Sequence, residues 1–305
     1  MKKNILIFSW LLLAAAAARA GVTGAQFLRI DTDARLSGMA SAGMASAYGI
    51  NSLNYNPAGL SAITGAEVAF SHSKWLMDSN HDFVGFGFAV KRKGPEAAGN
   101  RFAVGVGVTR LSNGSIDGRG EDRSVSGGYS AYDQAISLGF GFKNMGGTVK
   151  YIQSSIAGVK AEAFAVDLGA KRALSRIPVT LGFGVQNLGG GIKYLSQRDN
   201  LPLSLNAGLS FMAFPGIALA LDAKHLVYDK QTVFSAGTEY SMLATGNIGF
   251  ALRGGYGLTG LAQDSGKNGL SVGAGIMALG AQLDYALSPE TGLGSIQRIT
   301  LKKKF

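Results

Sequence analysis

The chain has 305 residues, a formal net charge of +10 and no cysteine. The absence of cysteine excludes disulfides and thiolate metal sites. The 45 glycines, about twice the usual share, disfavour a fold built on long helices. A basic charge without a nucleic-acid-binding motif gives no reason to expect a nucleic-acid partner.

Residues 1–20 have the features of a cleaved signal peptide. Two lysines precede an apolar run from Ile5 to Ala18, and the small-residue sequence that ends at Ala20 forms a cleavage site. The run has about fourteen residues, which is short of the roughly twenty that a spanning helix needs. We therefore expect cleavage after Ala20 and export from the cytoplasm. The cleavage removes three basic residues and lowers the net charge from +10 to +7.

Residues 21–65 form a segment of a different kind from the rest. The stretch DTDARLSGMASAGMASAYGINSLNYNPAGLSAI is rich in Ala, Gly, Ser and Met, carries a candidate helix cap at Asp33, and lacks sustained alternation. A barrel of about fourteen strands is too wide for its wall side chains to fill. We therefore expect this segment to fold inward as a plug, or hatch. A loose periplasmic arm is the alternative.

The motif Asn56-Pro57-Ala58-Gly59 lies near the end of this segment. Pro57 fixes its backbone φ and lacks an N–H, while Gly59 permits a sharp exit, so the motif predicts a rigid turn before the first strand. Asn56 can hydrogen-bond the local backbone there. Two interpretations remain open at this stage: a latch that holds the hatch, or simply a turn.

Residues 66–305 alternate large apolar residues with small ones in about fourteen short segments. In RFAVGVGVTRL, the large residues from Phe102 to Val108 alternate with alanine, glycine and threonine, the period of a β-strand. Beyond the signal peptide, no run of 18 apolar residues is free of charges or glycine clusters, so spanning helices are excluded. A closed sheet satisfies every backbone N–H and C=O in hydrocarbon. We predict an all-β fold, a transmembrane antiparallel β-barrel of about fourteen strands.

Charged residues within these segments fall on the small-residue face, which we therefore expect to line a wet lumen. They are Asp133, Lys150, Asp167, Lys171, Asp222, Glu239, Arg253 and Asp284. An exported soluble β-sandwich would show the same alternation. The signal peptide and the large number of strands favour the membrane barrel.

The links between segments also have a regular pattern. Those after the third, seventh and eleventh segments, residues 112–128, 187–201 and 257–268, are long and polar, whereas links after even segments are mostly shorter. Bacterial barrels have long extracellular links, short periplasmic turns and both termini in the periplasm. The pattern predicts this topology.

Few residues suggest a chemical site. The letters from Gly255 to Gly260 match a dinucleotide-binding pattern, but no βαβ unit surrounds them, so we expect a loop. The histidines His72, His81 and His225 have no carboxylate at metal-ligand spacing and are expected at the surface. Trp75 is expected to anchor at the membrane interface or to contact a partner. The sequence predicts no catalytic residue, no metal and no cofactor.

The carboxyl-terminal sequence QRITLKKKF alternates as a last strand. It places Ile299, Leu301 and Phe305 on the lipid face, with Arg298, Thr300 and Lys302 on the inward face. A terminal phenylalanine on such a strand resembles the signal that the barrel-assembly machinery recognises. Phe305 is therefore the expected assembly signal.

Several segments together resemble the PorV/PorQ family of outer-membrane proteins. They include ARLSGMASAGMASAYGINSLNYNPAGLSAI, EVAFSHSKWLMD, VKYIQSSI, GFGVQNLGGGIKY, LPLSLNAGLSF and LDYALSPETGLGSIQRITLKKKF. That family is related to FadL transporters, whose hatch carries an Asn-Pro-Ala motif; Asn56, Pro57 and Ala58 match it. The resemblance implies a fourteen-stranded FadL-like barrel with an inward amino-terminal segment. It also implies a role in type IX protein secretion.

Two functions follow as hypotheses, both non-enzymatic and both in the bacterial outer membrane. The first is a component of protein export or surface assembly, whose partners would be membrane lipid, the barrel-assembly machinery, and secretion-system proteins or exported substrates. The alternative is a FadL-like passive transporter of hydrophobic small molecules. A continuous apolar pocket behind Met39, Met44 and Tyr48 would favour transport, whereas a sealed lumen would favour partner binding.

Overall fold

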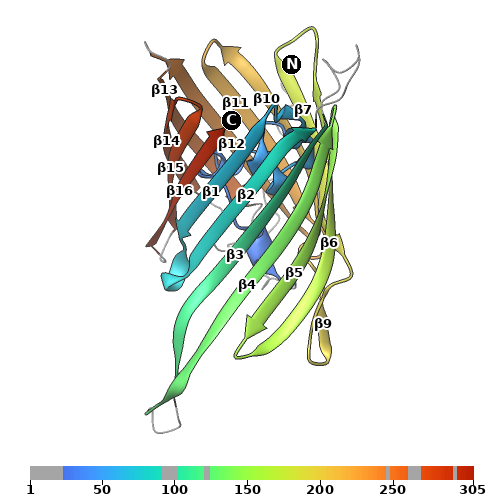
Figure 1. The fold of residues 1–305 in the computed structure, drawn as a ribbon, viewed down its shortest axis with the longest axis vertical. Coiled ribbons are helices and arrows are strands. Elements are labelled where there is room, and N and C mark those ends of the chain that lie inside the picture. Colours follow the sequence, from blue (N-terminus) through green and yellow to red (C-terminus); the bar gives the residue numbers. More distant parts are fainter. Residues whose placement is uncertain (1–22, 91–101, 120–123, 245–247, 260–268, 291–293) are drawn as a thin grey trace, which may run out of the picture.

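The computed structural model describes residues 23–90, 102–119, 124–244, 248–259, 269–290 and 294–305. The expected signal peptide lies outside these residues. Fourteen strands form a closed antiparallel barrel in which β1 pairs with the last strand, β16, so the sheet has no free edge (Figure 1). The all-β barrel predicted from the alternation is confirmed.

The wall strands follow one another around the barrel in chain order. They are β1 (Ala66–Lys74), β2 (Asn80–Val90), β3 (Phe102–Arg119), β4 (Val125–Phe142), β5 (Met145–Ile156), β6 (Val159–Ala173), β7 (Val179–Gly189), β10 (Ser204–Phe214), β11 (Ile217–Leu226), β12 (Gln231–Leu243), β13 (Gly249–Thr259), β14 (Gly269–Ala278), β15 (Ala281–Glu290) and β16 (Gly294–Lys304). A short hairpin of β8 (Ile192–Tyr194) and β9 (Gln197–Asp199) follows β7.

The helices of the described residues are short, with three to six residues each. They are η2 (Gln26–Arg29), α1 (Ala34–Ser37), η3 (Ile50–Asn54), η4 (Pro57–Ala62) and η5 (Leu76–Asp78), of which α1 is α-helical and the others are 3-10 helices. Among the residues that the structure describes, no helix is long and apolar enough to cross a membrane.

The two ends of the barrel differ. We call the end that holds Ala66 and Phe305 the proximal end, and the opposite end, which holds the links after odd-numbered wall strands, the distal end. The expected long link 112–128 is mostly strand, because β3 and β4 continue to Arg119 and from Val125 as a hairpin that projects at the distal end (Figure 1). The link after β7 carries the β8–β9 hairpin.

The sequence Gly255 to Gly260 is not the loop that we expected. Residues 255–259 continue β13 and pair with β12 as far as Val233↔Thr259, while Gly260 lies outside the described residues. The glycines suggested a loop, but they occupy inward positions of this strand. Only small residues fit there, because a Cβ on Gly255 would lie 2.4 Å from the carbonyl carbon of Met39.

Large apolar side chains point out of the wall. Phe86, Leu138 and Leu252 are 43%, 59% and 63% exposed, whereas their small neighbours face inward and are buried. On β16 the alternation places Ile299, Leu301 and Phe305 outside and Arg298, Thr300 and Lys302 inside, as predicted. The outer surface is therefore an apolar belt of the kind that faces lipid in membrane barrels.

Residues 23–65 lie inside the barrel, and we call them the plug (Figure 1, blue). Leu36, Met39 and Leu53 of the plug are 0% exposed. A Cβ atom built on Gly237 of β12 would lie 2.6 Å from both the Cβ and the carbonyl oxygen of Met39, and one built on Gly105 of β3 would lie 2.7 Å from Ile50 Cδ1. Wall glycines on opposite sides of the lumen thus contact the plug directly.

These contacts correct our expectation that the small-residue face is wet throughout. At the level of the plug, the inward face is covered by plug backbone and side chains rather than by solvent. Small residues occupy the inward positions of the wall because the plug packs within van der Waals distance, where any larger side chain would collide.

Candidate functional site

A polar chamber lies between the plug and the distal part of the wall. It consists of two adjoining pockets, both lined by Arg29, Ile30, Asp31, Ser41 and Ser235. The first extends toward β14, β15 and β16, and the second toward β7, β10 and β11. Their empty space is about 570 Å³ and about 610 Å³, each with an open mouth included.

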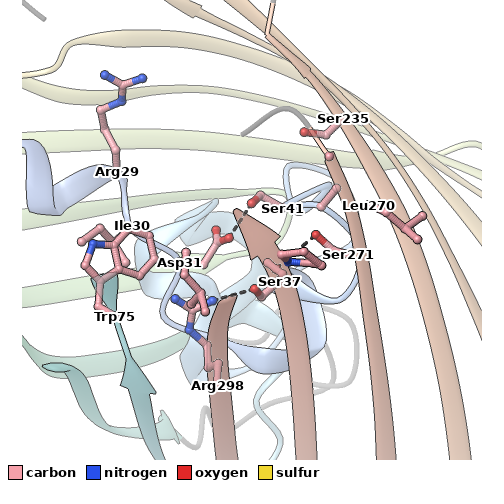
Figure 2. A pocket seen from close by; sticks show the side chains of 15 residues that line it. Arg29, Ile30, Asp31, Ser37, Ser41, Trp75, Ser235, Leu270, Ser271 and Arg298 are labelled. Atoms are coloured by element: carbon pink, nitrogen blue, oxygen red, sulfur yellow. Dashed lines mark hydrogen bonds between the residues drawn. The ribbon is translucent and has the colours of Figure 1, made fainter. Parts of the chain in front are cut away.

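The first pocket is centred on arginine and hydroxyl groups. Arg298 of β16 donates from Nε to Ser73 Oγ at 2.7 Å and from Nη1 to Ser37 Oγ of the plug at 2.6 Å. Figure 2 shows Arg298, Asp31 and Trp75 gathered around this space. The Asp31 carboxylate accepts hydrogen bonds from Ser41 Oγ at 2.5 Å and from Tyr55 Oη at 3.2 Å. The pocket thus joins the plug to β1 and β16.

Tyr55 of the plug lines the second pocket. Burial raises its pKa well above the ordinary value, and the charge of nearby Asp31 raises it further. The phenol therefore keeps its proton and acts as a donor to Asp31. On the wall side, Gln186 Nε2 donates to the carbonyl oxygens of Asn54 and Tyr55 at 2.9 Å and 2.8 Å, which fixes this part of the plug against β7.

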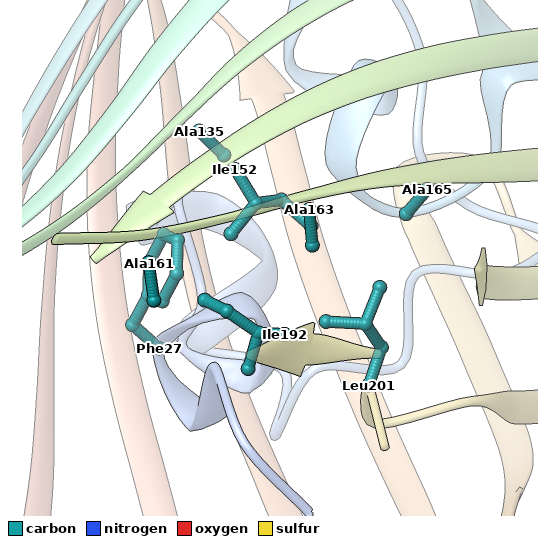
Figure 3. Close-up of a cluster of buried hydrophobic side chains, with 8 residues drawn as sticks. All are labelled: Phe27, Ala135, Ile152, Ala161, Ala163, Ala165, Ile192 and Leu201. Atoms are coloured by element: carbon teal, nitrogen blue, oxygen red, sulfur yellow. The ribbon is translucent and has the colours of Figure 1, made fainter. Parts of the chain in front are cut away.

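Phe27 holds the first turn of the plug at the distal end. It is 2% exposed and packs in a cluster with Ile192 of the β8–β9 hairpin, Leu201, Ile152 of β5 and alanines of β4 and β6 (Figure 3). The hairpin after β7 therefore serves as a cover for one side of the lumen. Thr23 also forms a β-bridge with Asn200 beside this hairpin.

A chain of buried ion pairs holds the middle of the plug to the wall. Arg35 binds Glu239 of β12 with two hydrogen bonds of 2.8 Å, from Nε and Nη2. Arg253 of β13 donates to the same carboxylate at 2.6 Å and to Asp284 of β15 at 2.7 Å. The Arg253 side chain is 1% exposed. Because buried charges are stable only when they are paired, each member of this chain depends on the others.

The Asn56 motif is a buried docking element rather than only a turn. Asn56 is 0% exposed, caps η4 by accepting from Ala58 N at 3.1 Å, and donates from Nδ2 to Met44 O at 2.7 Å and Ala170 O of β6 at 3.1 Å. Pro57 begins the helix at its favoured first position. Gly59 is needed for space, not for a sharp exit: a Cβ there would lie 2.6 Å from Ala47 O.

The eight charges predicted for the lumen all lie on the inward side of the wall, and none is exposed. The structure brings Glu239, Arg253 and Asp284 together. A second pair, Lys150 and Asp167, forms an ion pair of 2.7 Å between side chains that are 3% and 0% exposed.

The remaining three charges make separate contacts. Asp222 accepts from Met44 N at 2.7 Å, and Lys171 donates to Ala47 O at 2.6 Å, so both hold the plug. Asp133 accepts from Ser154 Oγ on the neighbouring strand.

Other predicted residues are placed as follows. Trp75 follows β1 at the distal end, is half-buried, and lines the first pocket instead of facing the lipid side. His72 and His225 are exposed, but His81 is 1% exposed and faces the lumen, which corrects its expected surface position. The alternation of β2 places it opposite buried Ser73. Phe305 lies at the proximal end and is 76% exposed.

Sequence analysis missed three charged residues of the chamber and plug as site residues. Arg298 was placed on the inward face but given no role, and Arg29 and Arg35 were passed over. The available signal was weak: each is an isolated basic residue in a stretch of small or apolar residues. Among the described residues, no three histidine, aspartate or glutamate side chains are placed to hold a metal ion.

The barrel is similar to solved hydrocarbon channels. The CymD monoaromatic hydrocarbon channel matches with a TM-score of 0.59 and 14% identity, over 90% of this chain and 97% of that chain. The P. putida toluene transporter TodX matches with a TM-score of 0.56 and 14% identity, over 90% of this chain and 99% of that chain. No family model and no curated protein sequence matches this chain. At such identity the likeness establishes a shared barrel fold.

Proposed function

We propose that this protein is a non-enzymatic, plug-gated channel that admits small molecules across the bacterial outer membrane. The observation that carries the proposal is a closed fourteen-strand barrel with an inward plug and a distal chamber, in a fold shared with the CymD hydrocarbon channel and the toluene transporter TodX. In this proposal the distal end is extracellular, and a solute reaches the chamber from that side.

The route beyond the chamber involves the plug. Every wall strand is hydrogen-bonded to both neighbours, and β2 and β3 stay in register from Asn80↔Ser112 to Val90↔Phe102. No lateral gap therefore opens in the described part of the wall. Met39 and Met44 are buried against wall glycines, and Met44 also lines the second pocket. Passage requires the plug to move, at the cost of breaking some of its polar contacts with the wall.

A component of protein export, of the PorV/PorQ type, is the second candidate. The plug favours it, because the plug packs closely against the wall inside the lumen, and a barrel that carries a bound partner at its rim has no need of an open path. The partners would then be secretion-system proteins or exported substrates at the distal loops. The two candidates differ in whether any solute crosses the barrel.

The test compares cells with and without the protein. We expect the deletion to slow uptake of small aromatic solutes while the set of surface-exposed proteins, measured by mass spectrometry, stays the same. Purified protein in liposomes should restore solute entry. Unchanged uptake together with loss of surface proteins would instead establish the export role and reject the channel.

A further inference from the structure

Arg298 carries a buried positive charge without a carboxylate partner. The residue is 2% exposed, and none of the ion pairs among the described residues includes it. Its neighbours across the sheet are Ser73 on β1 and Ala286 on β15, both uncharged. Nε and Nη1 are bonded to serine hydroxyls, but Nη2 is buried and makes no hydrogen bond. An unpaired buried guanidinium is costly, which points to a missing anionic partner.

The surroundings of Arg298 fit a small amphipathic anion. The charged residues that line the first pocket are Arg29, Asp31 and Arg298. Arg29 is paired with Asp229 at 3.3 Å, so among these described residues Arg298 is the cation that makes no ion pair. Ile30 and Trp75 (Figure 2) line the same space and supply apolar surface, and so does Ile296. A guanidinium with unused N–H groups suits a carboxylate, and an aromatic ring packs favourably against a tryptophan.

We propose that the first pocket is a selective binding site for small monovalent carboxylates with an aromatic body. The carboxylate binds Arg298 at Nη2, and the ring contacts Trp75 and Ile296. This inference rests on the proposed channel function, because it names the class of solute that the chamber selects. It also departs from the neighbours named above, whose hydrocarbon substrates carry no charge.

Trp75 provides a direct readout of binding. Trp10 falls within the expected signal peptide, which leaves Trp75 as the one tryptophan of a chain that starts at Gly21. Purified protein in detergent is titrated with sodium benzoate and, separately, with the neutral analogue benzyl alcohol. Tryptophan fluorescence and calorimetry follow binding. We expect saturable binding of benzoate, and weaker binding of benzyl alcohol.

Substitutions at Arg298 test the charge. Arg298→Gln should weaken benzoate binding about tenfold or more, the loss of a charge-assisted hydrogen bond, and leave benzyl alcohol binding unchanged. Arg298→Lys should retain part of the benzoate affinity. Removing an unpaired buried charge is not expected to unfold the barrel, and heat-dependent gel mobility checks this. Arg110→Gln is the matched control, because Arg110 is exposed on the outer face of β3.

Three results separate this inference from the channel itself. The carboxylate site is overturned if benzoate does not bind, or if it binds wild type and Arg298→Gln equally. In that case water satisfies Nη2. If liposomes with the protein admit benzyl alcohol in that case, the channel still stands. If neither solute enters the liposomes while benzoate still binds Arg298, the carboxylate site stands and the channel is rejected.

Discussion

Single inward glycines determine how closely the plug approaches the wall. Gly237 contacts the Met39 backbone, and Gly59 of the plug contacts the Ala47 carbonyl. In both places, backbone atoms of another segment occupy the volume that a Cβ would need. Because backbone atoms cannot rotate away as a side chain can, even a substitution by alanine is expected to lower the stability at these positions.

Gly237→Ala is therefore expected to destabilise the protein. The new Cβ would lie 2.6 Å from Met39 O, and overpacking of this kind costs about 1–3 kcal/mol. Unfolding by denaturant in detergent, monitored by heat-dependent gel mobility, measures the change in the free energy of unfolding. Gly114→Ala is the control, since a Cβ there meets no atom within 4 Å. Equal stability of the two variants would contradict the close packing of plug and wall.

Glu239→Gln should loosen the plug much more than a surface substitution does. The change leaves Arg35 and Arg253 without their shared negative charge, and breaking a buried pair costs about 3–5 kcal/mol. Limited proteolysis should then cut the plug faster. Asp82→Asn is the surface comparison, because it removes the exposed contact of 2.7 Å between Asp82 Oδ1 and His72 Nδ1. It should cost less than about 1 kcal/mol. Equal proteolysis rates would show that the Glu239 contacts do not hold the plug.

At the scale of elements, the plug is a series of very short helices and turns rather than an independent domain. Its helices have four to six residues by their bounds, which is too short for a stable isolated helix. They are held instead by wall side chains that bond plug backbone, such as Asp222, Gln186 and Lys171. Buried apolar side chains such as Leu36 and Leu53 add to this hold, so displacing the plug breaks polar contacts and also exposes apolar surface.

A reversible disulfide tests whether transport needs the plug to move. A Cβ built on Gly208 lies 2.9 Å from Met44 Cβ, and a shift of about 1 Å would reach the separation found in disulfides. The Asp222 carboxylate, whose Oδ1 lies 2.1 Å from that Cβ, must rotate aside in both cysteine variants. The chain has no cysteine of its own, so Met44→Cys with Gly208→Cys can form one bond. Solute uptake into liposomes should stop on oxidation and return with a reductant.

The single variant Gly208→Cys controls for the redox treatment and should transport equally in both states. If the oxidised double variant transports as fast as the reduced one, the solute does not pass by displacement of the plug. A path along the wall would then have to be sought.

At the scale of the whole molecule, the apolar belt and the closed sheet determine how the protein sits in a membrane. The proposed orientation places the distal end, with the long β3–β4 hairpin and the β8–β9 hairpin, outside the cell. The proximal turns, such as the one between β4 and β5, then face the periplasm. This arrangement puts the chamber on the side from which solutes arrive.

Cysteine labelling tests this orientation. Lys160→Cys, near the distal start of β6, should react with a membrane-impermeant maleimide on intact cells, because the residue is exposed. Asn144→Cys, in the proximal turn, should react only after the outer membrane is permeabilised. The absence of native cysteine removes background labelling. Labelling of Asn144→Cys alone on intact cells would show the reverse orientation.

The sequence by itself determined the barrel. Period-two alternation assigns each residue to one face of the sheet regardless of what lies beyond that face. For this reason the outward position of Ile299 and the inward position of Arg298 could be predicted from local pattern alone. The absence of cysteine, the number of strands and the bounds of the plug segment could also be predicted from the sequence.

Tertiary structure alone decided what fills the lumen and where the chamber lies. Arg35 meets Glu239 across 204 residues of sequence, and Arg298 meets Ser37 across 261. Neither contact can be recognised from a local sequence pattern. The plug has no hydrophobic periodicity, and its helices are too short for helix propensity to identify them. The fit of the irregular plug inside the barrel decides which inward polar groups are paired and which have no partner. That fit is a property of three-dimensional packing.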